Sequence, residues 1–187
     1  MGFFTWEHSK CRAYFVLYGS VVMVATAYLL VASPREQRLE NMVFTLAGLG
    51  SWTAIEYVMH RFVLHGFQPF RQWHAEHHHC PTKMIRGTII LSGILISILV
   101  IFPALLLGDL WRACALSLGL LTGYFGYAIT HHAIHHWRIE NAWLKARKRW
   151  HVQYHHHSQQ PGCYGVTSSF WDNVFGSTPR TVVSKSC

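Results

Sequence analysis

Four apolar segments, each long enough to cross a lipid bilayer, constrain this chain more than any other feature. They cover residues 13–32, 42–59, 88–107 and 113–130, so each has 18 or 20 residues. At a rise of about 1.5 Å per residue, a helix of this length covers most or all of a hydrocarbon core about 30 Å thick. Hydrophobic residues make up 51% of the chain, which is too apolar for an ordinary soluble domain. We therefore expect residues 1–187 to form one all-α integral membrane domain.

Short polar connections predict that the four transmembrane helices form two antiparallel hairpins. Residues 33–41 join the first pair, and residues 108–112 join the second. Of the 16 Lys and Arg residues, all except Arg35, Arg38 and Arg112 fall on the side that carries both termini. Because cytoplasmic loops are enriched in Lys and Arg, we expect this side to face the cytoplasm, at a bacterial inner membrane or the endoplasmic reticulum.

Histidine is strongly over-represented, with 15 residues against 8 acidic ones. It suits neither a lipid-facing position nor a helix interior, so this number needs a reason of its own. The histidines gather at the cytoplasmic ends of the second and fourth helices and within 131–187, which predicts a histidine-rich helical cap there. Residues three or four apart share one face of a helix and can direct their imidazoles at one point. Pairs with this spacing are His74 with His77 and His78, His131 with His135, and His151 with His155.

His60 and His65 are five residues apart and would diverge on a regular α-helix. They converge only if the helix breaks between them, or else each serves a different metal, and a two-metal centre favours the second option. Imidazole binds zinc, copper, iron and nickel alike. The ligands are too many for one closed structural zinc site. We expect two iron ions if the chemistry is oxygen activation, with zinc as the alternative in the isolated protein.

The histidine groups and a C-terminal motif resemble those of the fatty acid hydroxylase/sterol desaturase superfamily. The chain reads HxxxxH from residue 60, HxxHH from residue 74 and GVTSSFWDNVFGS over 165–177. The resemblance covers about residues 50–177. The sphingolipid and fatty acid 2-hydroxylase branch is the most similar, followed by the short four-helix carotenoid hydroxylases. Members are membrane-embedded dimetal enzymes that use dioxygen and two electrons.

The resemblance also implies which histidines bind the metals. One of them departs from the family pattern, because His151 lies four residues before His155 where the usual spacing is three. The implied ligands are His60 and His65 from the first box, His74, His77 and His78 from the second, His131 and His135 after the fourth helix, and His151, His155 and His156 near the C-terminus.

Three carboxylates, those of Glu56, Glu76 and Asp172, are candidates for orienting these imidazoles by accepting the second ring N–H. Glu56 is the first candidate, because it lies one turn before His60 in an apolar helix, where a carboxylate is costly without a partner. For Asp172, a role as a turn or helix-capping residue is an equal alternative.

Together these features predict a membrane-bound non-haem di-iron oxygenase that hydroxylates a C–H bond of a lipid, with a fatty acyl chain as the expected substrate. The sequence has no GxGxxG, flavin or cytochrome motif, so the two electrons are expected from a separate donor of the ferredoxin or cytochrome b5 type.

Three other functions compete with lipid hydroxylation. Desaturation or carotenoid hydroxylation on the same scaffold remains open, because these reactions begin with the same hydrogen abstraction. A non-enzymatic metal carrier or sensor is disfavoured, because its ligands would be spread through the membrane rather than collected at one face. Nucleic-acid binding would fit the net charge of +8, but the four spans and the lack of a recognisable module exclude it.

Overall fold

The computed structural model describes residues 2–79, 88–138, 140–156 and 162–178, and every regular element in these ranges is helical. The predicted all-α fold is therefore confirmed. The α-helices are α1 (Gly2–Ala32), α2 (Arg38–Val58), α3 (Phe70–His79), α4 (Thr88–Leu107), α5 (Leu110–His136), α6 (Ala142–His156) and α7 (Phe170–Val174). A 3-10 turn, η1 (Arg35–Gln37), precedes α2, and a π-helix, η2 (Met59–Leu64), continues it.

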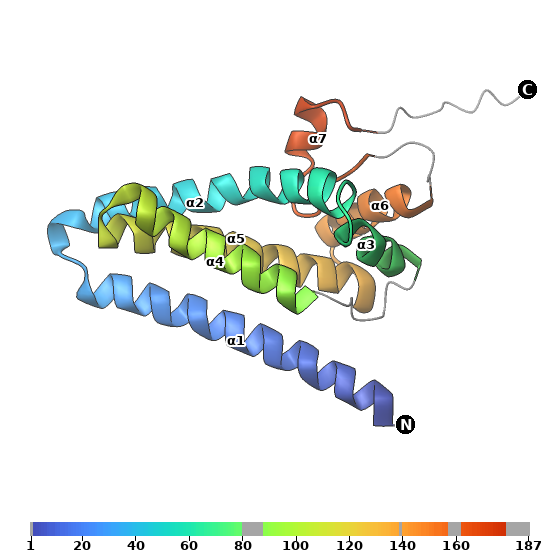
Figure 1. Ribbon diagram of the computed structural model, residues 1–187, viewed down its shortest axis with the longest axis horizontal. Coiled ribbons are helices and arrows are strands. Elements are labelled where there is room, and N and C mark those ends of the chain that lie inside the picture. The colour runs from blue at the N-terminus through green and yellow to red at the C-terminus, as the bar shows by residue number, and fades with distance from the viewer. Residues whose placement is uncertain (1, 80–87, 139, 157–161, 179–187) are drawn as a thin grey trace, which may run out of the picture.

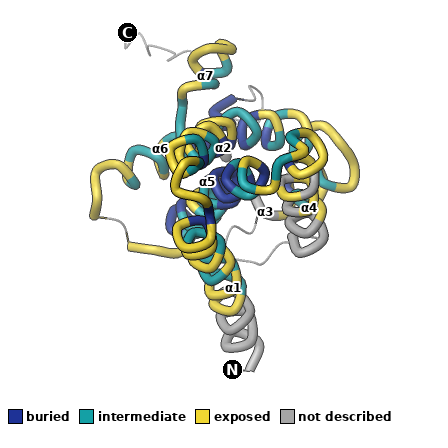
Figure 2. Tube along the Cα trace, turned by 90° about the vertical axis from the view of Figure 1, so that its left-hand side faces the viewer, coloured by how far each residue is buried: buried dark blue, intermediate teal, exposed yellow. Residues whose placement is uncertain are grey.

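The four long helices α1, α2, α4 and α5 run along the length of the molecule, and the shorter α3, α6 and α7 gather at one end (Figure 1). Helix α5 lies at the centre, where it packs against α2, α4 and α1 and forms the most buried part of the chain (Figure 2). The turns from α1 to α2 and from α4 to α5 lie at the end opposite the short helices (Figure 1).

Local chemistry sets the ends of these helices. Helix α4 ends at Gly108, whose φ of 60° lies in the left-handed region that glycine adopts without strain. Asp109 then caps α5 by accepting a hydrogen bond from the Arg112 amide at 2.8 Å. Asn141 begins α6 in the same way, because its side-chain oxygen accepts from the Trp143 amide at 2.8 Å.

Helices α2 and α5 approach each other closely because glycines face each other across their interface. A Cβ on Gly119 would lie 2.8 Å from the Leu49 nitrogen, and a Cβ on Gly48 would lie 3.0 Å from the Leu120 nitrogen. Small residues of this kind let helices pack backbone against backbone in a bilayer, where water exclusion does not drive association. This contact fixes the spacing of the two helices that carry the histidines.

Three helical stretches among the described residues are long and apolar enough to cross a membrane: Arg12–Ala32, Arg35–Leu64 and Leu110–His136. Large apolar side chains lie exposed on the outer helices, among them Leu17 and Leu46, as expected of surfaces that face lipid. The chain is therefore an integral membrane protein. The remaining predicted segment, 88–107, is helix α4 and packs on α5, and its own crossing stays a prediction.

Candidate metal centre

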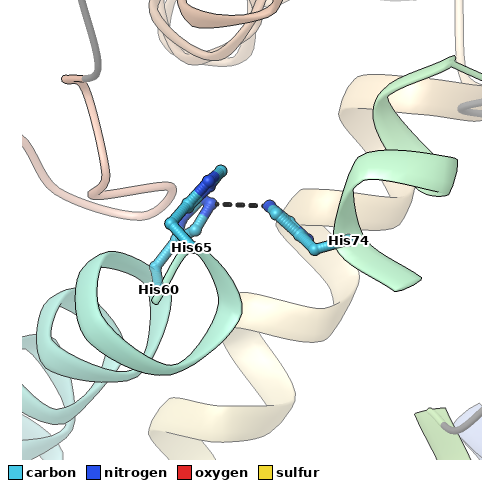
Figure 3. A group of neighbouring side chains, drawn as sticks. All are labelled: His60, His65 and His74. Carbon is cyan, nitrogen blue, oxygen red and sulfur yellow. Dashed lines mark hydrogen bonds between the residues drawn. The ribbon is translucent and has the colours of Figure 1, made fainter. Parts of the chain in front are cut away.

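The first histidine group forms where α2 changes from α to π geometry. In a π-helix residue i bonds residue i+5, so residues five apart lie on one face. His60, in η2, and His65, just after it, therefore stack with ring centroids 5.1 Å apart. His74 reaches them from α3, with its Nε2 3.1 Å from Nε2 of His60 (Figure 3). The spacing of His60 and His65 left two options, a break in the helix between them or a different metal for each. In the structure the helix changes to π geometry, and both histidines lie in one group.

A second histidine group joins α5 to α6. His131 and His135 lie one turn apart on α5, with their Nε2 atoms 3.3 Å apart, as their spacing predicts. His151 of α6 brings its Nε2 to 3.1 Å from that of His135, and the residue is only 1% exposed. The departure of His151 from the family spacing therefore does not keep it out of the cluster.

Both groups have the spacing that a transition-metal ion requires. In each, three imidazole nitrogens lie within 4.8 Å of one another. With metal–nitrogen bonds of about 2.1 Å, neighbouring ligand atoms are separated by about 3.0 Å in an octahedron and about 3.4 Å in a tetrahedron. The closest nitrogen pairs, at 3.1 to 3.3 Å, fall in this interval. The rings of His60 and His151 lie 6.3 Å apart, so the two groups adjoin and fit a two-metal centre.

A loop from the C-terminal motif closes over the first group. The Tyr164 carbonyl oxygen lies 2.5 Å from Nδ1 of His60. The Tyr164 ring packs against both histidines, with centroids 6.0 Å from His60 and 5.7 Å from His65. Burial raises the pKa of the Tyr164 phenol, although the nearby Arg61 guanidinium opposes this, so the phenol stays neutral near pH 7. Tyr164 thus meets the histidines as a carbonyl acceptor and an uncharged ring.

The residue before Tyr164, Cys163, is a buried thiol. Burial raises its pKa to about 12. Both groups of converging ligand atoms in the described part of the chain are made of histidines, and Cys163 belongs to neither.

Two of the three carboxylates predicted to orient imidazoles contact the loop instead. The Asp172 carboxylate is fully buried and accepts from the amides of Tyr164 and Gly165, each at 2.8 Å. Oε1 of Glu56 accepts from the amides of Val166 and Thr167, at 2.6 and 2.9 Å. The positions of the two residues explain these contacts. Glu56 faces the loop from α2, and Asp172 lies in α7, the short helix that follows the loop.

The other predicted site residues divide into two sets. Glu76 is exposed on α3 and belongs to neither group of converging ligand atoms in the described part of the chain. Four predicted ligands, His77, His78, His155 and His156, lie at the ends of α3 and α6, and their side chains fall outside the described part of the structure. The Tyr164 carbonyl was not predicted, because a backbone acceptor has no side-chain signature in the sequence.

Comparison with known proteins agrees with this geometry. The family model described as "Fatty acid hydroxylase" matches residues 45–177. The ceramide very long chain fatty acid hydroxylase of Schizosaccharomyces pombe is 34% identical over 73% of this chain and 42% of its own length. A dihydroceramide fatty acyl 2-hydroxylase of Arabidopsis thaliana is 35% identical over 71% of this chain and 59% of its own. The chain thus spans about half the length of these relatives.

A solved structure has the same fold. Full-length scs7p, in which only the hydroxylase domain is visible, superposes with a TM-score of 0.75 at 29% sequence identity. The match covers 88% of this chain and 65% of that one.

Proposed function

The chain belongs to the fatty acid hydroxylase family, and from this premise we propose that it hydroxylates a C–H bond in the acyl chain of a membrane lipid. The observation that carries the proposal is the pair of adjoining three-histidine groups at one end of an apolar bundle. The balanced reaction converts R–H, dioxygen, two electrons and two protons into R–OH and water. The relatives' names, which specify ceramide and dihydroceramide acyl chains, support a sphingolipid as the substrate.

We propose two iron ions as the resident metals. One would be held by His60, His65 and His74, and the other by His131, His135 and His151; His77, His78, His155 and His156 are proposed to complete the two sets. When bound, iron supplies the redox change that dioxygen activation needs and that zinc lacks. The protein's own part is to hold the imidazoles in place and to keep bulk water from the apolar chain.

The bilayer arrangement that we propose has four spans in two hairpins, with the histidine end and both termini in the cytoplasm. It is supported by the positions of the two turns, which lie together at the end opposite the cap (Figure 1). Helix α6 in the cap exposes three basic residues, Lys145, Lys148 and Arg149. Their positive charge favours a cytoplasmic position for the cap under the positive-inside rule. It would also attract an acidic electron donor. We propose a ferredoxin or cytochrome b5 type protein as that donor, and lateral entry of the acyl chain from the bilayer.

The test is lipid mass spectrometry of the native host, with and without this gene, grown under isotopically heavy dioxygen. A lipid that gains one heavy oxygen only when the gene is present would establish the hydroxylase and name its substrate. A gene carrying His74→Ala should give no labelled lipid, whereas Glu36→Gln, an exposed change at the opposite end of the bundle, should behave as wild type. Loss of two hydrogens would establish a desaturase instead, and a metal-loaded protein that changes no lipid would contradict the enzyme proposal.

A further inference from the structure

We propose that Glu56 and Asp172 are positioning residues that act together, through one loop, on the proton of His60. The loop comprises residues 164–167, and it places the Tyr164 carbonyl against that imidazole. This inference rests on the proposed metal centre and adds a function for two buried carboxylates that touch no metal-facing nitrogen.

The carbonyl decides which nitrogen of His60 carries the proton. A carbonyl oxygen only accepts hydrogen bonds, so Nδ1 must donate across the 2.5 Å to Tyr164. In a neutral imidazole the other nitrogen, Nε2, then keeps its lone pair free for a metal. Nε2 is also the atom that faces His74, at 3.1 Å. The loop therefore selects the tautomer that points a lone pair into the first histidine group.

The two carboxylates fix the position of that carbonyl. Four consecutive backbone amides, those of residues 164 to 167, each donate to Asp172 or Glu56 at 2.6 to 2.9 Å. The hydroxyl groups of Ser177 and Thr167 add one hydrogen bond to each carboxylate. A shift of the loop would break several of them at once, and a buried carboxyl group that loses its hydrogen-bond donors is costly.

The covalent arrangement keeps the loop in register with the histidine. Glu56 and His60 are four residues apart on one continuous helical segment, so the carboxylate and the ligand move together. The loop is closed at its base, where the Cys163 amide donates to the Ser177 carbonyl at 3.0 Å. Gly165 fits only as glycine, because a Cβ there would lie 3.0 Å from Oδ2 of Asp172 and would run into the Ser168 carbonyl.

The inference predicts an effect confined to one of the two metals. The Tyr164 carbonyl of the loop accepts from His60, which belongs to the first group. Changing groups that orient a ligating imidazole weakens metal binding by about 10- to 100-fold. The loss should appear at the site of His60, His65 and His74, while the site that contains His135 keeps its affinity.

The experiment loads the full-length protein in lipid nanodiscs with Zn²⁺, a redox-silent probe, and measures its release to a chromogenic chelator. Wild type should hold two ions per chain and release them in two steps, which His74→Ala and His135→Ala assign to their sites. Glu56→Gln and Asp172→Asn should each release the first-site ion at about 10- to 100-fold lower chelator concentration. Because both residues act through one loop, the double variant should lose no more than the more affected single variant.

The control is Asp109→Asn, which also removes a carboxylate from a backbone amide but lies at the other end of the bundle. It should leave both release steps unchanged. Equal shifts of both steps in Glu56→Gln and Asp172→Asn, no shift in either, or fully additive losses in the double variant would overturn the inference and leave the proposed enzyme intact. A wild-type protein that holds no Zn²⁺ would instead overturn the metal centre itself.

Discussion

The close contact between α2 and α5 gives a sharp prediction for Gly119→Ala. The new Cβ would lie 2.8 Å from the Leu49 nitrogen, about 0.6 Å inside the 3.4 Å at which ordinary contact begins, and closer still to the Thr45 carbonyl. Backbone atoms cannot rotate away as a side chain can, so the two helices must separate. Overpacking of this kind costs up to about 3 kcal/mol, and the helix propensity of alanine returns about 1 kcal/mol. We expect a net loss of about 2 kcal/mol, or a fall in Tm of about 4–8 °C.

Gly126→Ala is the matched control, because Gly126 lies on the same helix and a Cβ there would meet nothing within 4 Å. It should raise Tm by a few degrees through helix propensity alone. Thermal unfolding of both variants in the same nanodiscs, followed by circular dichroism, measures the difference. Separation of α2 from α5 also moves His60 away from His135, so Gly119→Ala should hydroxylate less lipid at temperatures where it is still folded. Equal melting of the two variants would refute the close-packing argument.

Three further predictions concern the site. Gly165→Ala should lower the occupancy of the first metal site, measured as metal per chain, because its Cβ collides with the Ser168 carbonyl; full occupancy would contradict the loop geometry. Removal of the metals with a chelator should abolish hydroxylation, and Fe²⁺ but not Zn²⁺ should restore it, since zinc has no redox change. Cys163 has a pKa of about 12 against an ordinary 9.0, so the folded thiol keeps a proton that the unfolded one loses. Its contribution to stability is therefore present below pH 9 and is lost as the pH rises toward 12, which unfolding of Cys163→Ser against pH would check.

The sequence predicts those parts of the molecule that depend on local periodicity. The segment 88–107 coincides with α4, and the spacing of His131 and His135 places both imidazoles at one point, as found. Both results follow from the helical repeat and need no knowledge of the tertiary structure.

The first histidine group depends on information that local periodicity lacks. The π geometry of Met59–Leu64 brings His60 and His65 together, yet this stretch contains no proline or glycine to mark a change of helix type. The position of His74 depends on how α3 folds back over the end of α2, which is set by tertiary packing. The Tyr164 carbonyl belongs to the backbone and is reached only once the loop is placed.

The two histidine groups are built in the same way, and the bundle and the cap have different roles in them. In the first group, the end of the α2–η2 segment contributes two histidines and the cap helix α3 contributes the third. In the second group, the end of α5 contributes two histidines and the cap helix α6 contributes the third. Because α2 and α5 are in backbone contact, the membrane bundle sets the separation of the two groups. The cap helices determine whether each group is closed. Changes at the glycine interface should therefore alter both metals together, whereas changes in α3, α6 or the 164–167 loop should alter one.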